Sequence, residues 1–182
     1  MASPFSHAVA ALGISAWFYQ PRTAKRVWVL GTACSLLPDL DALGYLFGIP
    51  YAGSWGHRGF THSLVFAAGM ASVIVAAAFR HGVAEMRPLL LWSYFFLVTA
   101  SHGFLDAMTV GGLGVAFFAP FDNRRFFLPW TPIGVSPIGV NRFFTSPRLA
   151  VSPSEILWIW LPAIVLSVAA FLLRRPSQPS RD

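Results

Sequence analysis

The stretch Ser154–Leu173, SEILWIWLPAIVLSVAAFLL, decides the fold class of this 182-residue chain. A membrane-spanning helix needs ~20 mostly apolar residues, so this stretch predicts a transmembrane helix, with a kink expected at Pro162. The whole composition agrees: 55% of residues are hydrophobic and 11% are charged, whereas soluble domains have about 25% charged residues. The mean hydropathy is +0.60. So few charges could not cover a soluble fold, and the bilayer is the better solvent.

Further apolar segments precede this helix. They run from about Pro4 to Tyr19, from Val27 to about Leu46, from about His62 to Phe79 and from Pro88 to about Met108. We therefore predict an all-α polytopic membrane protein of about five short transmembrane or membrane-embedded helices. Residues 1–173 form one domain, and we expect the basic tail 174–182 to be disordered. The long connection 109–153, rich in Gly, Pro and aromatic residues, has the character of a functional loop.

The basic residues predict the orientation of the chain in the membrane. The net charge is +6, which we interpret as a topology signal and not as a sign of nucleic-acid binding. Eight basic residues fall in the two short connections and the tail, against five over much longer stretches on the other side. The positive-inside rule then places the N-terminus outside and the C-terminus in the cytoplasm. Membrane lipids are the expected surroundings and partners.

Seven ionisable side chains are predicted to meet at one membrane face. When successive helices alternate in direction, the face away from the short basic loops receives His7, Asp39, Asp41, His57, His62, His102 and Asp106. A charge within a membrane span costs roughly 2.5–3.5 kcal/mol, so such a gathering indicates a functional site. Each motif has a simpler explanation, such as a helix cap or a local hydrogen bond. Together, those explanations require several unrelated coincidences on one face.

The residue types at this face favour a catalytic metal ion. Imidazole nitrogens and carboxylate oxygens without thiolates suit zinc, with manganese or iron(II) as alternatives, and Cys34 is the lone cysteine. A metal-bound water reaches a pKa near ~7 and becomes a nucleophile. The first choices as ligands are Asp39, His62, His102 and Asp106, followed by His57, Asp41 and His7. A bridging aspartate would allow two ions instead of one.

Other residues are predicted to act on the substrate. Asp41 is the expected general base, Arg58 is expected to stabilise negative charge in the transition state, and His57 joins this catalytic group. Arg124 and Arg125 are candidates for substrate binding, because guanidinium groups match phosphate best. The alternative is that these arginines bind lipid headgroups. An anionic small molecule or lipid is thus the expected substrate.

The motifs together resemble the YdjM-like family of inner-membrane, metal-dependent hydrolases, described as regulated by the DNA-damage repressor LexA. The resemblance implies a bacterial inner-membrane location and hydrolase activity, and it identifies kinship better than substrate. It covers roughly residues 5 to 140 and rests on His7, Leu37-Pro38-Asp39-Leu40-Asp41, Gly56-His57-Arg58-Gly59-Phe60-Thr61-His62-Ser63, Ser101-His102-Gly103-Phe104-Leu105-Asp106 and Ala119-Pro120-Phe121-Asp122-Asn123-Arg124-Arg125-Phe126.

A fainter likeness reaches the zinc-dependent phospholipase C and P1 nuclease group, which orders an early His, an Asp, a His and HxxxD on helices. Carried over by position, it implies that one zinc is shared by Asp39, His57 or His62, His102 and Asp106, and that His7 with Asp106 supports another. The group's later His and Glu ligands have no counterpart, because no histidine follows His102. The likeness therefore does not extend to a full trinuclear centre.

The resulting hypothesis is a membrane-bound, metal-dependent hydrolase acting on a phosphoester or phospholipid-type substrate, with its site on the periplasmic face. A transporter or a proton or metal conduit is one rival, and it predicts ionisable groups at several depths across the membrane. A non-enzymatic membrane protein with a structural metal is the other, and it predicts a closed site.

Overall fold

The computed structural model describes residues 1–20, 23–80, 86–135 and 151–174. Across these residues the regular structure is helical, without a β-strand and with isolated bridges only at Thr109–Ile133 and Val115–Phe126. This confirms the predicted all-α class. The elements in chain order are α1 (Pro4–Phe18), α2 (Lys25–Leu36), η1 (Leu37–Phe47), η2 (Phe60–His62), α3 (Leu64–Ala78), α4 (Pro88–Ala107), α6 (Pro153–Glu155), η4 (Ile156–Trp160) and α7 (Leu161–Leu173).

Several of these elements are long and apolar enough to cross a bilayer. They are the continuous helices Lys25–Phe47, Pro88–Ala107 and Pro153–Leu173, with Leu64–Ala78 a shorter apolar helix. Together with α1, they match the prediction of about five short membrane helices. The last helix, in which a kink is expected at Pro162, contains a π segment just before that proline. There, the N–H of Leu161 donates to the carbonyl of Ile156, five residues back. Such a segment accommodates a proline that cannot donate to the preceding turn.

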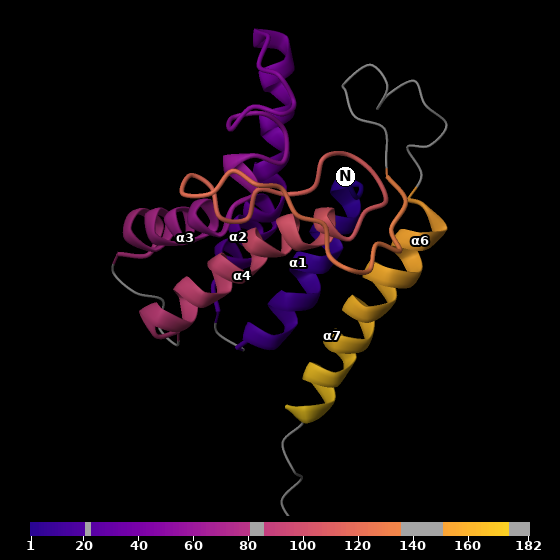
Figure 1. Cartoon of the computed structure of the whole chain (residues 1–182). Coiled ribbons are helices and arrows are strands. Elements are labelled where there is room, and N and C mark those ends of the chain that lie inside the picture. The colour runs from indigo at the N-terminus through magenta and orange to yellow at the C-terminus, as the bar shows by residue number, and fades with distance from the viewer. Residues whose placement is uncertain (21–22, 81–85, 136–150, 175–182) are drawn as a thin grey trace, which may run out of the picture.

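Helix α4 lies at the centre of the bundle. It packs against α1, α2 and α3, while α7 packs along the other side of α1 (Figure 1). The buried core around α4 includes Tyr94, Phe95 and Val98, together with apolar side chains of α1, α2 and α3. The Tyr94 hydroxyl is satisfied there by a 2.9 Å hydrogen bond with Ser15. This central helix also carries His102 and Asp106, two of the residues predicted to bind a metal ion.

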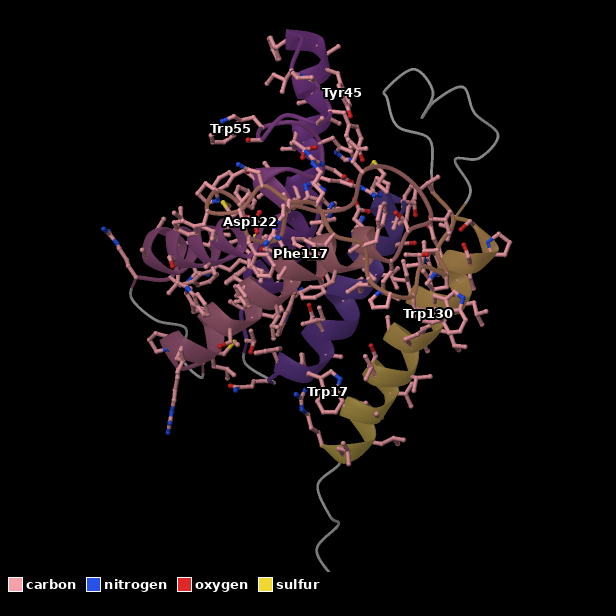
Figure 2. The ribbon with its side chains drawn as sticks, in the orientation of Figure 1. Trp17, Tyr45, Trp55, Phe117, Asp122 and Trp130 are labelled. Atoms are coloured by element: carbon pink, nitrogen blue, oxygen red, sulfur yellow. The ribbon has the colours of Figure 1, made fainter. Side chains whose placement is uncertain are left out.

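The helix ends sort into two groups. The N-termini of α1 and α6 and the C-terminus of α4 lie toward one end of the molecule, and the C-termini of α1 and α7 lie at the other (Figure 1). There, Arg174 donates to the carbonyls of Ala16 and Trp17. Aromatic side chains mark both ends, with Trp17 at one and Tyr45 and Trp55 at the other (Figure 2). Aromatic residues at both ends are typical of membrane–water interfaces.

The predicted long connection after α4 folds back over the helix ends (Figure 1). The N–H of Leu64 donates to the carbonyl of Phe117 at 3.0 Å, and the N–H of Ala116 donates to the carbonyl of Arg58 at 3.0 Å. This connection thereby covers the start of α3 and the segment before it. Residues 136–150 of the connection and 175–182 of the tail lie outside the described residues, so the expected tail disorder stays a prediction.

Candidate metal centre

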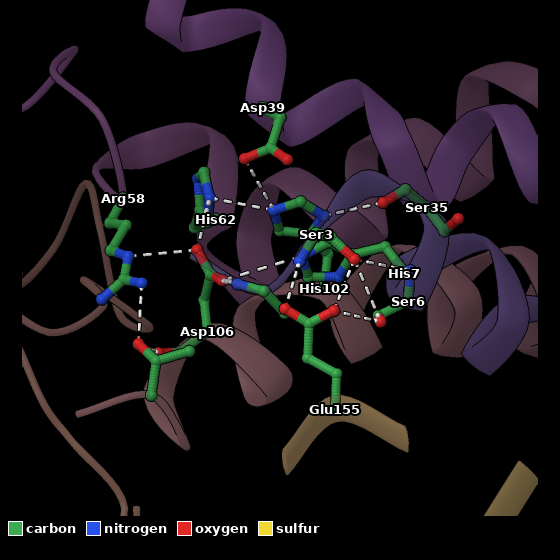
Figure 3. A network of polar contacts seen from close by, with 12 residues as sticks. Ser3, Ser6, His7, Ser35, Asp39, Arg58, His62, His102, Asp106 and Glu155 are labelled. Carbon is green, nitrogen blue, oxygen red and sulfur yellow. Dashed lines mark hydrogen bonds and ion pairs between the residues drawn. The ribbon is translucent and has the colours of Figure 1, made fainter. Parts of the chain in front are cut away.

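The predicted ligands meet where α1, η1, η2 and α4 converge (Figure 3). His7 comes from α1, Asp39 from η1, His62 from η2, and His102 and Asp106 from α4. Asp106 and the three histidines are at most 3% exposed, and the Asp39 side chain is 12% exposed. Segments separated by up to about a hundred residues thus bring five side chains of types that can bind a metal ion into one buried cluster, and Asp39 is the most exposed of the five.

Four of these residues have the spacing of a first coordination shell. His102 Nε2 lies 3.1 Å from His62 Nε2 and 3.3 Å from Asp39 Oδ1. His62 Nε2 lies 3.6 Å from Asp106 Oδ2. Ligand atoms bound tetrahedrally at about 2.0–2.2 Å from zinc lie about 3.3–3.6 Å from each other. One ligand atom from each of the four residues fits within a 4.8 Å limit, so the donor set fits a single divalent ion.

The outer contacts of the two histidines direct their Nε2 atoms inward. His102 Nδ1 donates to the carbonyl of Ser35 at 2.7 Å. His62 Nδ1 is 3.1 Å from the carboxylate of Asp41, which also accepts. The two Nε2 atoms therefore face each other at 3.1 Å. Burial opposes a charged ring, but the carboxylates of Asp106 and Asp41 outweigh it and raise the pKa of His62 to about 9. The surroundings thus favour a cation between the rings, either a proton or a metal ion, and an acceptor behind each histidine is typical of metal ligands.

Two other members of the cluster make no hydrogen bonds with the described residues. Both oxygens of Asp39 and both ring nitrogens of His7 are buried and lack a hydrogen-bond partner. The His7 ring stacks on His102 at 3.7 Å between centroids, and its Nε2 lies 3.7 Å from Asp106 Oδ1. Buried polar groups without partners are costly. A metal ion would supply the missing interaction, and Asp106, which faces His62 with one oxygen and His7 with the other, could bridge two ions.

Local helix geometry explains how neighbouring motif residues are distributed. His102 and Asp106 are four residues apart and share one face of an α-helix. Asp39 and Asp41 lie in the 3₁₀ segment η1, where each residue turns the chain by about 120°. Residues two apart on such a segment point in different directions. Asp39 therefore faces His102, whereas Asp41 faces the loop before α3.

Asp41, the predicted general base, lies behind His62. Its carboxylate accepts from His57 Nδ1 at 2.6 Å, from Thr61 Oγ1 at 2.6 Å and from the N–H of Arg58 at 3.2 Å, in addition to the His62 contact. One ligand atom each from Asp41, His57 and His62 also fit within 4.8 Å. His57 Nε2 is buried without a hydrogen bond to the described residues. The Asp41 carboxylate thus orients two imidazoles at once.

Arg58 is fully buried and holds Asp106 in place. Its Nε donates to Asp106 Oδ2 at 3.0 Å, and its terminal nitrogens donate to Thr109 Oγ1 and the carbonyl of Gly111, each at 2.8 Å. Its φ of 63° is in the left-handed region, which costs energy for a residue with a Cβ. Its backbone N–H and carbonyl, bonded to Asp41 and Ala116, hold that conformation.

The other two predicted substrate residues do not line the cluster. Arg125 donates to the carbonyls of Tyr51, Gly53 and His57, so it ties the 51–57 loop to the long connection. The Arg124 side chain is 79% exposed and pairs with Asp122 at 2.7 Å. Those hydrogen bonds hold the pKa of the Asp122 carboxyl below its usual value. Substrate binding by these arginines stays a prediction.

Sequence reasoning missed Glu155, the first charged residue of the last helix. It is fully buried, and its carboxylate accepts from Ser3 Oγ at 2.5 Å and from Ser6 Oγ at 2.6 Å, beside His7 (Figure 3). The signal was available, because the alternation of helices that gathers the other acids also brings the start of the fifth segment to this face. Glu155 was not predicted to belong to the cluster, because Ser152-x-x-Glu155 also matches a helix capping motif, which explains the acid locally.

Gly103 lets α4 approach η2, and this gives a first prediction. A Cβ at Gly103 would lie 2.7 Å from the carbonyl oxygen of His62, whereas a Cβ at Gly69 in α3 would meet nothing within 4 Å. We expect Gly103→Ala to destabilise the protein by about 1–3 kcal/mol, although alanine favours helix. Gly69→Ala, the matched control, should be neutral or stabilising by up to about 1 kcal/mol. Thermal unfolding in detergent measures both; equal shifts would contradict this account of Gly103.

The fold and the cluster define a class: a helical membrane protein with a metal-binding-capable His/Asp cluster at one end. The comparisons place the chain within that class. Residues 1–177 match the family described as YdjM inner membrane protein. The "Inner membrane protein YbcI" of Escherichia coli (strain K12) is 35% identical over 178 residues, covering 96% of this chain and all of that protein. The chain therefore belongs to the YdjM inner membrane protein family. No solved structure matches it.

Proposed function

We propose that this protein is a metal-dependent hydrolase that cleaves a phosphoester or phospholipid-type substrate at the periplasmic surface of the inner membrane. The observation that carries the proposal is the convergence of two imidazole Nε2 atoms, 3.1 Å apart, with the carboxylate of Asp39, whose oxygens make no hydrogen bond with the described residues. Zinc suits this nitrogen and oxygen donor set, with manganese or iron(II) as alternatives and one or two ions per chain. The orientation follows from the distribution of basic residues.

Five residues of the cluster are the proposed metal ligands. Asp39, His62, His102 and Asp106 would hold the ion, with His7 in reach of the second oxygen of Asp106. When bound, such an ion lowers the pKa of a water molecule to about 7 and polarises a phosphoryl oxygen.

His57 is better placed than Asp41 to accept a proton. The Asp41 carboxylate, 2.6 Å from His57 Nδ1, fixes the proton on that nitrogen and leaves Nε2 as a buried acceptor without a hydrogen bond to the described residues. The His57 ring is 5.3 Å from that of His62, between centroids. This orientation of an imidazole by a carboxylate is the arrangement of a general base.

The geometry weighs against a conduit. A conduit needs ionisable groups at several depths, yet α3 and α7 contain no Asp, Glu, His, Lys or Arg, and the cluster lies toward one end of the bundle. A structural metal site is closed to substrate, and an assay of hydrolysis separates that function from the proposed one.

Metal removal tests the proposal. Detergent-purified protein should contain close to one or two equivalents of zinc, manganese or iron by elemental mass spectrometry. It should hydrolyse a soluble phosphodiester such as bis(p-nitrophenyl) phosphate. A chelator should lower that rate by at least about tenfold, since the ion creates the nucleophile, and adding the metal back should restore it. If the protein holds metal but hydrolyses no phosphoester, a structural metal site replaces the proposal. If it binds none even after reconstitution, the metal-dependent mechanism is wrong.

A further inference from the structure

An apolar groove lies beside the metal cluster, on the helices that carry His7, His102 and Asp106. It has a volume of about 370 Å³ and lies between α4 and α7, with α1 as its floor. Small residues form that floor: α1 approaches α7 so closely at Gly13 that a Cβ there would lie 2.9 Å from the Cβ of Ala163. Apart from Ser101, whose hydroxyl bonds to its own helix at Val98, the groove is lined by apolar residues.

One end of the groove adjoins the candidate metal centre. Leu105 lines the groove and immediately precedes Asp106, and Ser101 immediately precedes His102. On α1, the groove residue Ala10 follows His7 by three positions, less than one helical turn. On α4, His102 lies between the groove residues Ser101 and Leu105, so the same helices present the polar ligands and the groove on neighbouring faces.

The groove is long enough to span about one membrane leaflet. Its lining on α4 extends from Phe96 to Leu105, which is about 13 Å at 1.5 Å per residue. Half of the hydrocarbon core of a bilayer is about 15 Å. At the mouth, Trp158 packs against Trp130 at 4.4 Å between centroids. Tryptophan pairs of this kind are typical of the headgroup level, so the groove begins at the interface and continues into the hydrocarbon.

The shape and lining of the groove suit a hydrocarbon chain. The groove is elongated, since it follows α4 for about 13 Å, and its lining is apolar apart from Ser101. We propose that this groove holds an acyl chain of the lipid substrate, which enters sideways from the membrane and brings its headgroup phosphoester to the metal cluster. The identity of the lipid as substrate rests on the proposed function; occupation of the groove does not.

Photo-labelling tests the groove without any turnover. The full chain would be placed in nanodiscs of phosphatidylethanolamine and phosphatidylglycerol, doped with a phospholipid that carries a diazirine in mid-chain. Mass spectrometry of peptides should find the label concentrated on the groove faces of α4 and α7. Ser101→Phe should reduce that labelling by about tenfold, because the ring occupies the volume of the chain. Ser93→Phe, a substitution of the same kind on α4 outside the groove lining, should change it less than about twofold.

A second variant and a fold control keep the result interpretable. Leu166→Trp fills the groove from α7, where Leu166 is 46% exposed, and should also reduce the labelling. Monodispersity on size exclusion shows that each variant is folded. Labelling that is uniform over the helices, or unchanged in both groove variants, would overturn the inference. So would disulfide cross-links between two copies of a Leu166→Cys protein, which would place a second chain in the groove. Normal groove labelling without any hydrolysis would leave the groove intact and refute only the proposed function.

Discussion

Replacing Asp39 with asparagine should abolish metal retention while leaving the fold intact. Asp39 is 3.3 Å from His102 Nε2, and neither of its oxygens makes a hydrogen bond with the described residues. The substitution therefore removes a ligand charge without breaking a structural contact. Loss of a residue that merely supports a ligand costs 10–100-fold in metal affinity, so loss of a ligand itself should cost more than about 100-fold. Phosphodiester hydrolysis should fall in parallel.

The measurement pairs metal content with stability. Elemental mass spectrometry should find less than about a tenth of the wild-type metal in Asp39→Asn, in line with that affinity loss. Thermal unfolding of the chelated proteins should agree within about 0.5 kcal/mol. Asp122→Asn changes an acid that pairs with the exposed Arg124, away from the cluster, and it should retain the metal. A metal content equal to wild type, or a large loss of stability in the chelated variant, would show that Asp39 is structural and not a ligand.

The sequence was sufficient to predict the helices and most of the cluster, for a physical reason. Apolar runs of fixed length identify membrane helices, and alternating directions then assign each ionisable residue to a face. This reasoning found His7, Asp39, His62, His102 and Asp106 before any packing was known. The fold brings all of them together, because the helix and loop ends that carry them converge at one end of the bundle.

The sequence alone does not show which residues contact each other within the cluster. Asp39 and Asp41 look equivalent as an Asp-x-Asp motif, but the 3₁₀ turn of η1 sends one to His102 and the other behind His62. Arg58 looks like a free cation for an anionic substrate, yet its guanidinium is buried against Asp106. These distinctions depend on side-chain directions set by tertiary packing, which periodicity does not encode.

The buried pair of Arg58 and Asp106 should carry the largest stability effect in the chain. Both side chains are 0% exposed, and Arg58 Nε lies 3.0 Å from Asp106 Oδ2. Removing one partner of a buried ion pair leaves the other charge uncompensated, which costs about 3–5 kcal/mol. We therefore expect Asp106→Ala to unfold about 6–20 °C below wild type, since 1 kcal/mol corresponds to about 2–4 °C in a chain of this size. Comparing chelated proteins removes any contribution of the metal itself.

A double-mutant cycle separates the ion pair from the other roles of Asp106. Arg58→Met removes the guanidinium that Asp106→Ala would leave unpaired, so the double variant should be more stable than Asp106→Ala alone. The coupling free energy should exceed about 1 kcal/mol, within the range expected for residues in direct contact. The double variant should still lack metal, because it lacks Asp106, one of the proposed ligands. A double variant no more stable than Asp106→Ala would mean that the cost arises elsewhere, with the hydrogen bond from the N–H of Ala2 at 2.9 Å as the next candidate. Stability is thus recoverable at this position and metal binding is not, which is the behaviour expected of a carboxylate that holds a metal ion on one side and a buried arginine on the other.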